Sequence, residues 1–220
     1  MYDDITGYIL EMVRTSDFLL FKLNVNGYPL VSVFWNLLLL APSYYSARYL
    51  TALWDRANLR NLRHKLLFFI FFFVWLLFIP NSAYIISEVR HILDFCPDNF
   101  YHICLSNAWI PIFFFVYGLI GWLAFAYLLG QMRELIIKIK GRTVADILIL
   151  SIIPMVAAGV ILGLMGRFNS WEIFVHPVKI ANLQLNLFLT QEYLKNLFFY
   201  ILFFYLLYFT GNRVLKFDKS

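Results

Sequence analysis

Four polar side chains that follow Pro80 are spaced to share one face of a helix. They are Asn81, Tyr84, Glu88 and His91. Successive members are three, four and three residues apart, and residues three or four apart lie on the same helical face. Glu88 and His91 form an E-x-x-H pair, which helical bundle proteins use to direct a carboxylate and an imidazole at one metal ion. The pair could instead act as base and acid, or form a hydrogen-bonded pair that stabilises an interfacial helix.

One such pair is no complete metal site, because about two further ligands would be needed. The two cysteines, Cys96 and Cys104, match no zinc or redox spacing. They could form a disulfide within one short loop or remain unpaired. We therefore predict no metal site and no cofactor.

A second polar segment follows Gly166. Arg167 could bind a phosphate or carboxylate through two hydrogen bonds, or pair with Glu88. Asn169 could cap the following helix, and Trp171 fits the aromatic belt of a membrane interface. Ionisable and amide groups at this depth are costly unless they have partners, so this segment is the second candidate for a site.

The composition places these segments in a membrane protein. Hydrophobic residues make up 62% of the 220 residues and the mean hydropathy is +0.73, whereas soluble domains are roughly 45–50% apolar. Since a spanning helix needs about 20 apolar residues, we expect five spans, at residues 29–53, 64–80, 108–130, 146–166 and 196–212. The apolar runs lack period-2 alternation, so the predicted fold is an all-α polytopic transmembrane helix bundle.

We expect two regions in the chain: an amphipathic N-terminal segment, residues 1–28, and a single transmembrane helical domain, residues 29–215. A sixth span within the first region would have to bury Glu11, Arg14 and Asp17. The fourth span contains Gly159 and Gly163 in a small-x-x-x-small pattern, which permits close helix approach. We therefore expect this helix at the centre of the bundle, and the aromatic fifth helix facing lipid.

The positive charges indicate the orientation. Two expected loops, residues 55–65 and 133–142, together with Arg48 and the C-terminal tail, hold 12 of the 18 Lys and Arg residues, and the other side holds six. The positive-inside rule then predicts an outer N-terminus and a cytoplasmic C-terminus. The net charge of +5 is thus explained by orientation and lipid headgroups, and no nucleic acid is expected as a partner.

This orientation puts both polar segments at the outer face of the membrane. We predict that they form one polar cluster there. Its members are Asn81, Tyr84, Glu88, His91, Arg167, Asn169 and Trp171.

Three sequence segments resemble a family of bacterial multi-pass membrane proteins, domain of unknown function 1361. The first reads FIPNSAYIISEVRHI, and is similar to the family signature P-N-x-x-Y-x-x-x-[DE]-x-x-H. The second, GRFNSWE at residues 166–172, is similar to G-R-F followed by N-S-W-[DE], and the third, WNLLLL from Trp35, to a first-helix pattern. Glu88 stands where the family usually has Asp, and about three residues that usually separate G-R-F from N-S-W are missing. The resemblance covers roughly residues 34–210 and implies a fold and a bacterial cytoplasmic membrane, but no activity.

Two classes of function remain open. The first is a non-enzymatic assembly, binding or transport-related component, whose partners would be membrane lipids and a membrane protein or second copy of the chain. It is favoured because no nucleophile elbow, phosphate loop or metalloprotease motif is present. The alternative is a membrane-embedded enzyme acting on a lipid-linked or amphipathic anionic substrate. Convergence of the two polar segments around a lipid-accessible cleft would favour the enzyme.

Overall fold

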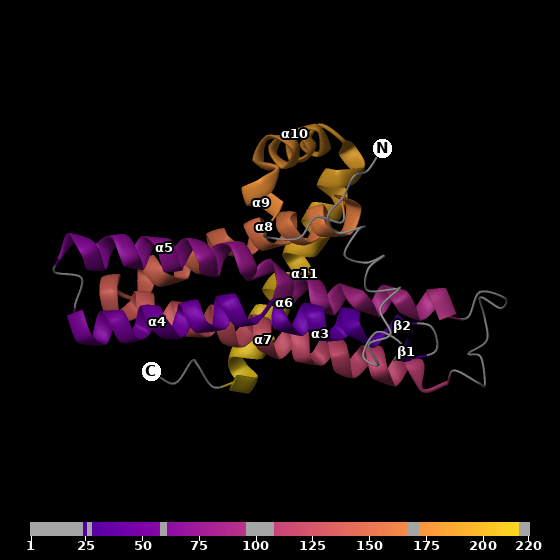
Figure 1. Ribbon diagram of the computed structural model, residues 1–220, viewed down its shortest axis with the longest axis horizontal. Coiled ribbons are helices and arrows are strands. Elements are labelled where there is room, and N and C mark those ends of the chain that lie inside the picture. Colours follow the sequence, from indigo (N-terminus) through magenta and orange to yellow (C-terminus); the bar gives the residue numbers. More distant parts are fainter. Residues whose placement is uncertain (1–23, 26–27, 58–60, 96–107, 167–171, 216–220) are drawn as a thin grey trace.

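The computed structural model describes residues 24–25, 28–57, 61–95, 108–166 and 172–215 (Figure 1). Helices make up almost all of this part of the chain, which confirms the all-α fold. A pair of two-residue antiparallel strands, β1 (Asn24–Val25) and β2 (Tyr28–Pro29), precedes them. The helices are α3 (Leu30–Leu38), α4 (Ala41–Ala57), α5 (Leu62–Phe78), α6 (Pro80–Ser87), the 3₁₀ helix η1 (Glu88–Phe95), α7 (Ile110–Lys140), α8 (Arg142–Gly166), α9 (Glu172–Val175), α10 (Pro177–Phe188) and α11 (Gln191–Leu215).

Five helical stretches in the described residues are long and apolar enough to cross a membrane. They are Leu30–Arg56, Leu62–Ile92, Ile110–Lys140, Arg142–Gly166 and Gln191–Leu215. Their number agrees with the five predicted spans, and the class of multi-pass membrane protein is confirmed.

The second span is longer than predicted. It was expected to end at Pro80, but Pro80 begins α6 directly after α5, and the stretch continues to Ile92. Proline is tolerated in the first turn of a helix because its missing N–H would have no intrahelical partner there. The helical path therefore continues through Ile79, and Tyr84 of α6 and Glu88 at the start of η1 lie near the far end of the span.

The expected basic loop at residues 133–142 is also wrong in part. The helix α7 continues through Arg133 to Lys140, and the turn to α8 is made at Gly141, which has a φ of 90°. Lys, Arg and Glu are good helix formers, so the charged residues extend α7 beyond its apolar part. Glycine adopts this positive φ without the steric cost that a Cβ would add.

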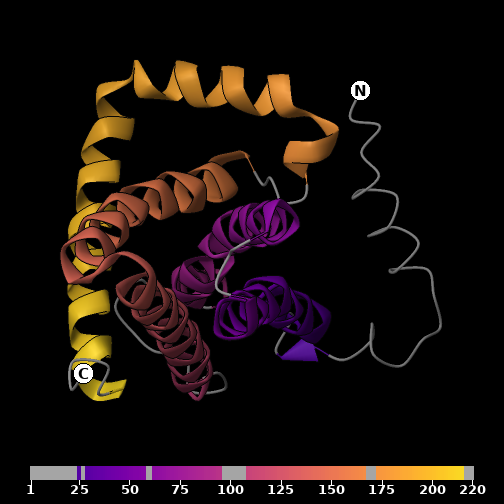
Figure 2. The same cartoon turned by 90° about the vertical axis from the view of Figure 1, so that its left-hand side faces the viewer.

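The helix α7 lies at the centre of the packing. It packs against α4, α6, η1, α8 and α11, whereas α8, which the sequence placed at the centre, packs against α6, α7 and α11. In Figures 1 and 2, α4, α5 and α7 run along the long axis of the molecule and α11 crosses that direction. Although α11 exposes several Phe and Leu side chains, as expected of an outer helix, it also buries Phe204 and Tyr208. The Trp122 indole of α7 donates a hydrogen bond to the Leu207 carbonyl of α11 at 2.8 Å.

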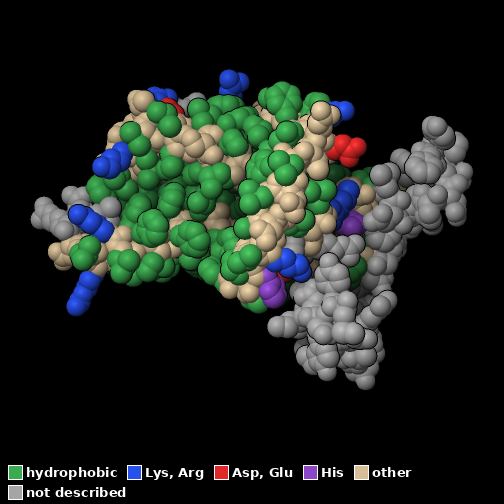
Figure 3. Space-filling view, turned by 90° about the horizontal axis from the view of Figure 1, so that it is seen from above, with side chains coloured by type: hydrophobic (Ala, Val, Ile, Leu, Met, Phe, Trp, Pro, Cys, Tyr) green, Lys and Arg blue, Asp and Glu red, His purple; other side chains and the backbone are tan. Residues whose placement is uncertain are grey.

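One end of the molecule collects basic side chains. The end of α4, the start of α5 and the turn between α7 and α8 lie together at the left of Figure 1, and Lys and Arg side chains project at the same end in Figure 3. A contact of 3.8 Å between Lys138 Nζ and Asp55 Oδ1 joins α7 to α4 there. The basic side chains on these four helix ends are Arg56, Arg63, Lys65, Lys138, Lys140 and Arg142. The 3₁₀ helix η1 and the start of α7 lie at the opposite end, on the right of Figure 1.

Candidate functional site

The site is organised around Glu88, where α6 changes into the 3₁₀ helix η1. Close packing of α6 on α7 fixes its position. A Cβ added to Gly121 of α7 would lie 2.9 Å from the Ser82 carbonyl oxygen and from the Ile85 side chain. Only glycine permits this approach. Glu88, directly after α6, is 3% exposed.

Glu88 lies against three polar side chains. The Tyr28 hydroxyl donates a hydrogen bond to Glu88 Oε2. His91 Nε2 lies 3.5 Å from the same oxygen, and Arg90 Nη2 lies 3.8 Å from Oε1. Since burying a carboxylate is costly unless it is paired and hydrogen-bonded, these neighbours explain how an acidic residue is accommodated here.

Tyr28 comes from the strand that precedes the first span. Its ring packs edge-on against Phe114 of α7 with 5.2 Å between centroids, and lies 5.3 Å from the His91 ring. Burial raises the pKa of the Tyr28 hydroxyl well above its usual value, and the hydrogen bond to Glu88 and the negative charge of that carboxylate raise it further. The hydroxyl therefore remains protonated and serves as a donor.

Arg90 connects Glu88 to Tyr84. Its Nη2 donates a hydrogen bond to the Tyr84 hydroxyl at 3.2 Å, and its guanidinium lies 5.8 Å from the centroid of the same ring. Arg90 Nε also lies 3.4 Å from His91 Nε2. The side chain of Arg90 is 41% exposed and that of His91 is 25% exposed, and Tyr84 is half-buried, so the cluster faces its surroundings through these three residues.

The structure brings together three of the predicted residues, Tyr84, Glu88 and His91. The Asn81 amide donates to the Phe78 carbonyl at 3.0 Å, across the junction of α5 and α6. The other predicted members, Arg167, Asn169 and Trp171, lie outside the described residues, as do Cys96 and Cys104. A single cluster of all seven residues therefore stays a prediction.

Two residues of the site were missed by sequence reasoning. Tyr28 lies 60 residues before Glu88, and no local pattern marks it as a partner. Arg90 was missed because it lies off the α-helical face that carries Glu88. The chain forms a 3₁₀ helix from Glu88 onward. Side chains three residues apart are eclipsed in a 3₁₀ helix, so His91 lies beside Glu88. Arg90 lies between Glu88 and His91 in the sequence. That position was the one feature of the sequence that could have identified it.

Within the described residues, His, Cys, Asp and Glu side chains do not gather in threes as a metal site requires. The groups that can interact with a ligand here are the Arg90 guanidinium and the His91 imidazole.

Five candidate spans and a buried polar cluster near the end of the second define a multi-pass integral membrane protein. Residues 35–209 match the model of a family described as Protein of unknown function (DUF1361), and the chain belongs to that family. Comparisons with curated proteins and with solved structures gave no match.

Proposed function

We propose that this protein acts by binding, as a non-enzymatic assembly, binding or transport-related component of a membrane. The observation that supports this most directly is the burial of Glu88 at 3% exposure, with the Tyr28 hydroxyl bonded to it. A general base or nucleophile must come within hydrogen-bonding distance of its substrate. A carboxylate enclosed by Tyr28, His91 and Arg90 is better placed to join the segment before the first span to α6.

The orientation we propose has the N-terminus outside and the C-terminus in the cytoplasm of a bacterial plasma membrane. The grouping of basic side chains at the ends of α4, α5, α7 and α8 supports it, because such residues favour the cytoplasmic side. The partners would be membrane lipids and either another membrane protein or a second copy of the chain. Nucleic acid is not among them.

The depth of Glu88 follows from its distance along the second span from the basic helix ends. The apolar run of α5 begins at Leu66, directly after the last basic residue, Lys65. Glu88 follows 22 residues later, and at 1.5 Å per residue this corresponds to roughly 33 Å. Since the hydrocarbon core is about 30 Å thick, we place Glu88 at the outer interface.

The composition of membrane lipids provides a test of binding against catalysis. Mass spectrometry would compare membranes of cells that produce the protein, cells that produce Glu88→Gln, and cells that produce neither. A binding component should leave the chemical identity of the membrane lipids unchanged in all three. A lipid species that accumulates or disappears with the parent protein but not with Glu88→Gln would overturn the proposal.

The alternative is an enzyme that acts on an amphipathic anionic substrate, and the partial exposure of Arg90 and His91 beside Glu88 favours it. A guanidinium can hold a phosphate or carboxylate, and an imidazole can transfer a proton near neutral pH. In the same experiment this enzyme would produce the lipid change that the binding proposal excludes.

A further inference from the structure

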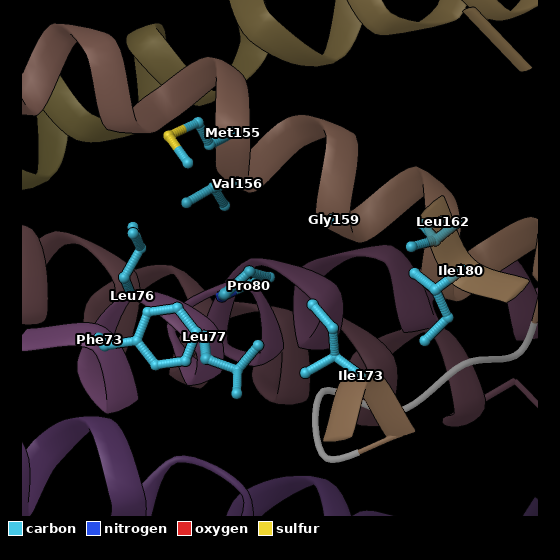
Figure 4. Close-up of a pocket in the computed structure, with 10 residues that line it drawn as sticks. All are labelled: Phe73, Leu76, Leu77, Pro80, Met155, Val156, Gly159, Leu162, Ile173 and Ile180. Carbon is cyan, nitrogen blue, oxygen red and sulfur yellow. The ribbon is translucent and has the colours of Figure 1, made fainter. Parts of the chain in front are cut away.

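An apolar pocket lies between the second and fourth candidate spans, and Glu88 is not among the described residues that line it. Leu77 of α5, Pro80 of α6 and Leu162 of α8 line it, and Ile173 of α9 and Ile180 of α10 close one end (Figure 4). Its volume is about 280 Å³, and among the residues that the structure describes, those that line it all have apolar side chains or none. Apolar cavities of roughly 150 Å³ already hold benzene, so a segment of hydrocarbon chain fits this one.

The pocket is formed by one close helix contact. A Cβ added to Gly159 of α8 would lie 3.1 Å from the ring of Pro80, so α8 and α6 touch at this point. The Ile79–Pro80 junction joins α5 to α6 beside this contact, and Pro80 and Gly159 both line the pocket. The hollow is therefore part of the helix packing.

The surroundings of the pocket indicate its occupant. Its walls belong to candidate membrane spans, and the molecules that surround such helices are lipids. An acyl chain gains no hydrophobic free energy by moving from the bilayer into an apolar pocket. Selective binding therefore requires tight packing and a contact to the headgroup.

The side chain of Lys179, near the start of α10, can provide that contact. Lys179 and His176 are both exposed, and they lie one and four residues before the lining residue Ile180. Glu172 of α9, nearby in the chain, is buried. A basic residue near the membrane surface attracts anionic lipid.

We propose that the pocket binds one hydrocarbon chain of an anionic membrane lipid, with the headgroup beside Lys179. This inference rests on the proposed binding function and names its ligand class. The lipid sits with its chain between α5–α6 and α8 and its headgroup at the start of α10.

Photo-crosslinking of the full chain in lipid nanodiscs tests the proposal. The probe is phosphatidylglycerol with a diazirine near the end of one acyl chain, and the matched probe is phosphatidylcholine with the same chain. We expect saturable labelling of peptides that contain Leu77 or Ile173, with tighter half-saturation for phosphatidylglycerol. Excess unlabelled phosphatidylglycerol should compete.

Variants identify the pocket and the headgroup contact separately. Leu162→Trp fills the pocket and should weaken half-saturation about tenfold, equivalent to roughly 1.4 kcal/mol. The control is Leu150→Trp, on the same helix but not among the residues that line the pocket. It should leave half-saturation unchanged. Lys179→Ala should weaken phosphatidylglycerol about fivefold, from the roughly 1 kcal/mol of one basic residue, and leave phosphatidylcholine unchanged. Lys195→Ala removes the same charge from α11 as a control. If Leu162→Trp does not fold, Ile173→Trp fills the pocket from α9.

Labelling that does not saturate, or that spreads evenly to Leu150 and other lipid-facing residues, would show ordinary surrounding lipid and overturn the proposal. Crosslinks from the pocket to a protein would identify a protein occupant and overturn it as well. If the pocket does not bind lipid, crosslinking fails but membrane lipid composition stays unchanged. If the protein is an enzyme, membrane lipid composition changes, so the two failures are distinguishable.

Discussion

The hydroxyl of Tyr28 donates a hydrogen bond to the carboxylate of Glu88, which lies 60 residues further along the chain. Tyr28 belongs to the strand before the first span, and Glu88 begins η1 directly after α6. The bond therefore joins the chain before the bundle to the far end of the second span. Both side chains are buried, so the bond forms where water does not compete for the donor.

Removal of either partner should lower the stability of the protein in detergent. Tyr28→Phe deletes the donor and leaves a buried carboxylate with one bond fewer, at a cost of about 1–3 kcal/mol. Glu88→Gln keeps the shape and removes the charge. Because the two residues share one interaction, the double variant should lose less than the sum of the single losses, as measured by thermal melting. Strict additivity would show that the two side chains are not coupled.

The stability should also decrease at high pH because of Tyr28. Burial raises the pKa of this hydroxyl in the folded protein, whereas an unfolded tyrosine titrates near about 10. Below pH 10 both states are protonated and the contribution of Tyr28 is fully present. Above that value only the unfolded state releases the proton, so stability falls by up to about 1.4 kcal/mol per pH unit.

The control for this pH effect is Tyr28→Phe, because the chain contains 14 tyrosines and others also titrate. The difference in melting temperature between parent and variant should shrink as the pH rises from 9 to 11. A difference that stays constant over this range would contradict a buried, protonated Tyr28.

The sequence predicted the number of spans and part of the Glu88 cluster, but not the ends of the spans or the contact with Tyr28. Runs of about 20 apolar residues are unmistakable, so the number of spans follows directly. Their ends are less certain, because Pro80 continues a helical stretch and Arg133–Lys140 extends another. The spacing of Tyr84, Glu88 and His91 identified part of the site. Tyr28 could not be found, since contacts between distant segments depend on tertiary packing that a single sequence does not record.

The approach of α6 to α7 should depend on Gly121 and not on Gly118. A Cβ at Gly121 would lie 2.9 Å from the Ser82 backbone oxygen, whereas one at Gly118 would meet only ordinary contacts of 3.8 and 3.9 Å with Ile86. Gly121→Ala should therefore destabilise the protein by about 1–3 kcal/mol through overpacking. Gly118→Ala should be neutral or slightly stabilising, because alanine favours a helix by about 0.5–1 kcal/mol over glycine. Equal melting temperatures for the two variants would contradict this packing.

The ion pair between α7 and α8 should contribute more than the one between α7 and α4. Arg133 Nε lies 2.7 Å from Asp146 Oδ1 and Arg133 is buried, whereas both Lys138 and Asp55 are more than half exposed at a separation of 3.8 Å. Asp146→Asn should cost about 1 kcal/mol, because it leaves a buried guanidinium with a neutral acceptor, and because the 43% exposure of Asp146 limits the loss through solvent screening. Asp55→Asn should change stability by less than about 1 kcal/mol, as is usual for surface pairs. Melting curves that lose the same stability in both variants would contradict the assignment of Arg133 as the buried partner.

The proposed orientation can be tested with single cysteines in a background where Cys96 and Cys104 are replaced by Ser. Arg142 lies at the turn between α7 and α8, Lys65 lies near the start of α5, and Lys179 lies near the start of α10; all three are exposed. A membrane-impermeant maleimide applied to intact spheroplasts should label Lys179→Cys, and should label Arg142→Cys and Lys65→Cys only after permeabilisation. The physical reason is the retention of Lys and Arg on the cytoplasmic side. Labelling of Arg142→Cys in intact spheroplasts would reverse the orientation, and it would move Glu88 and the Lys179 headgroup contact to the inner leaflet.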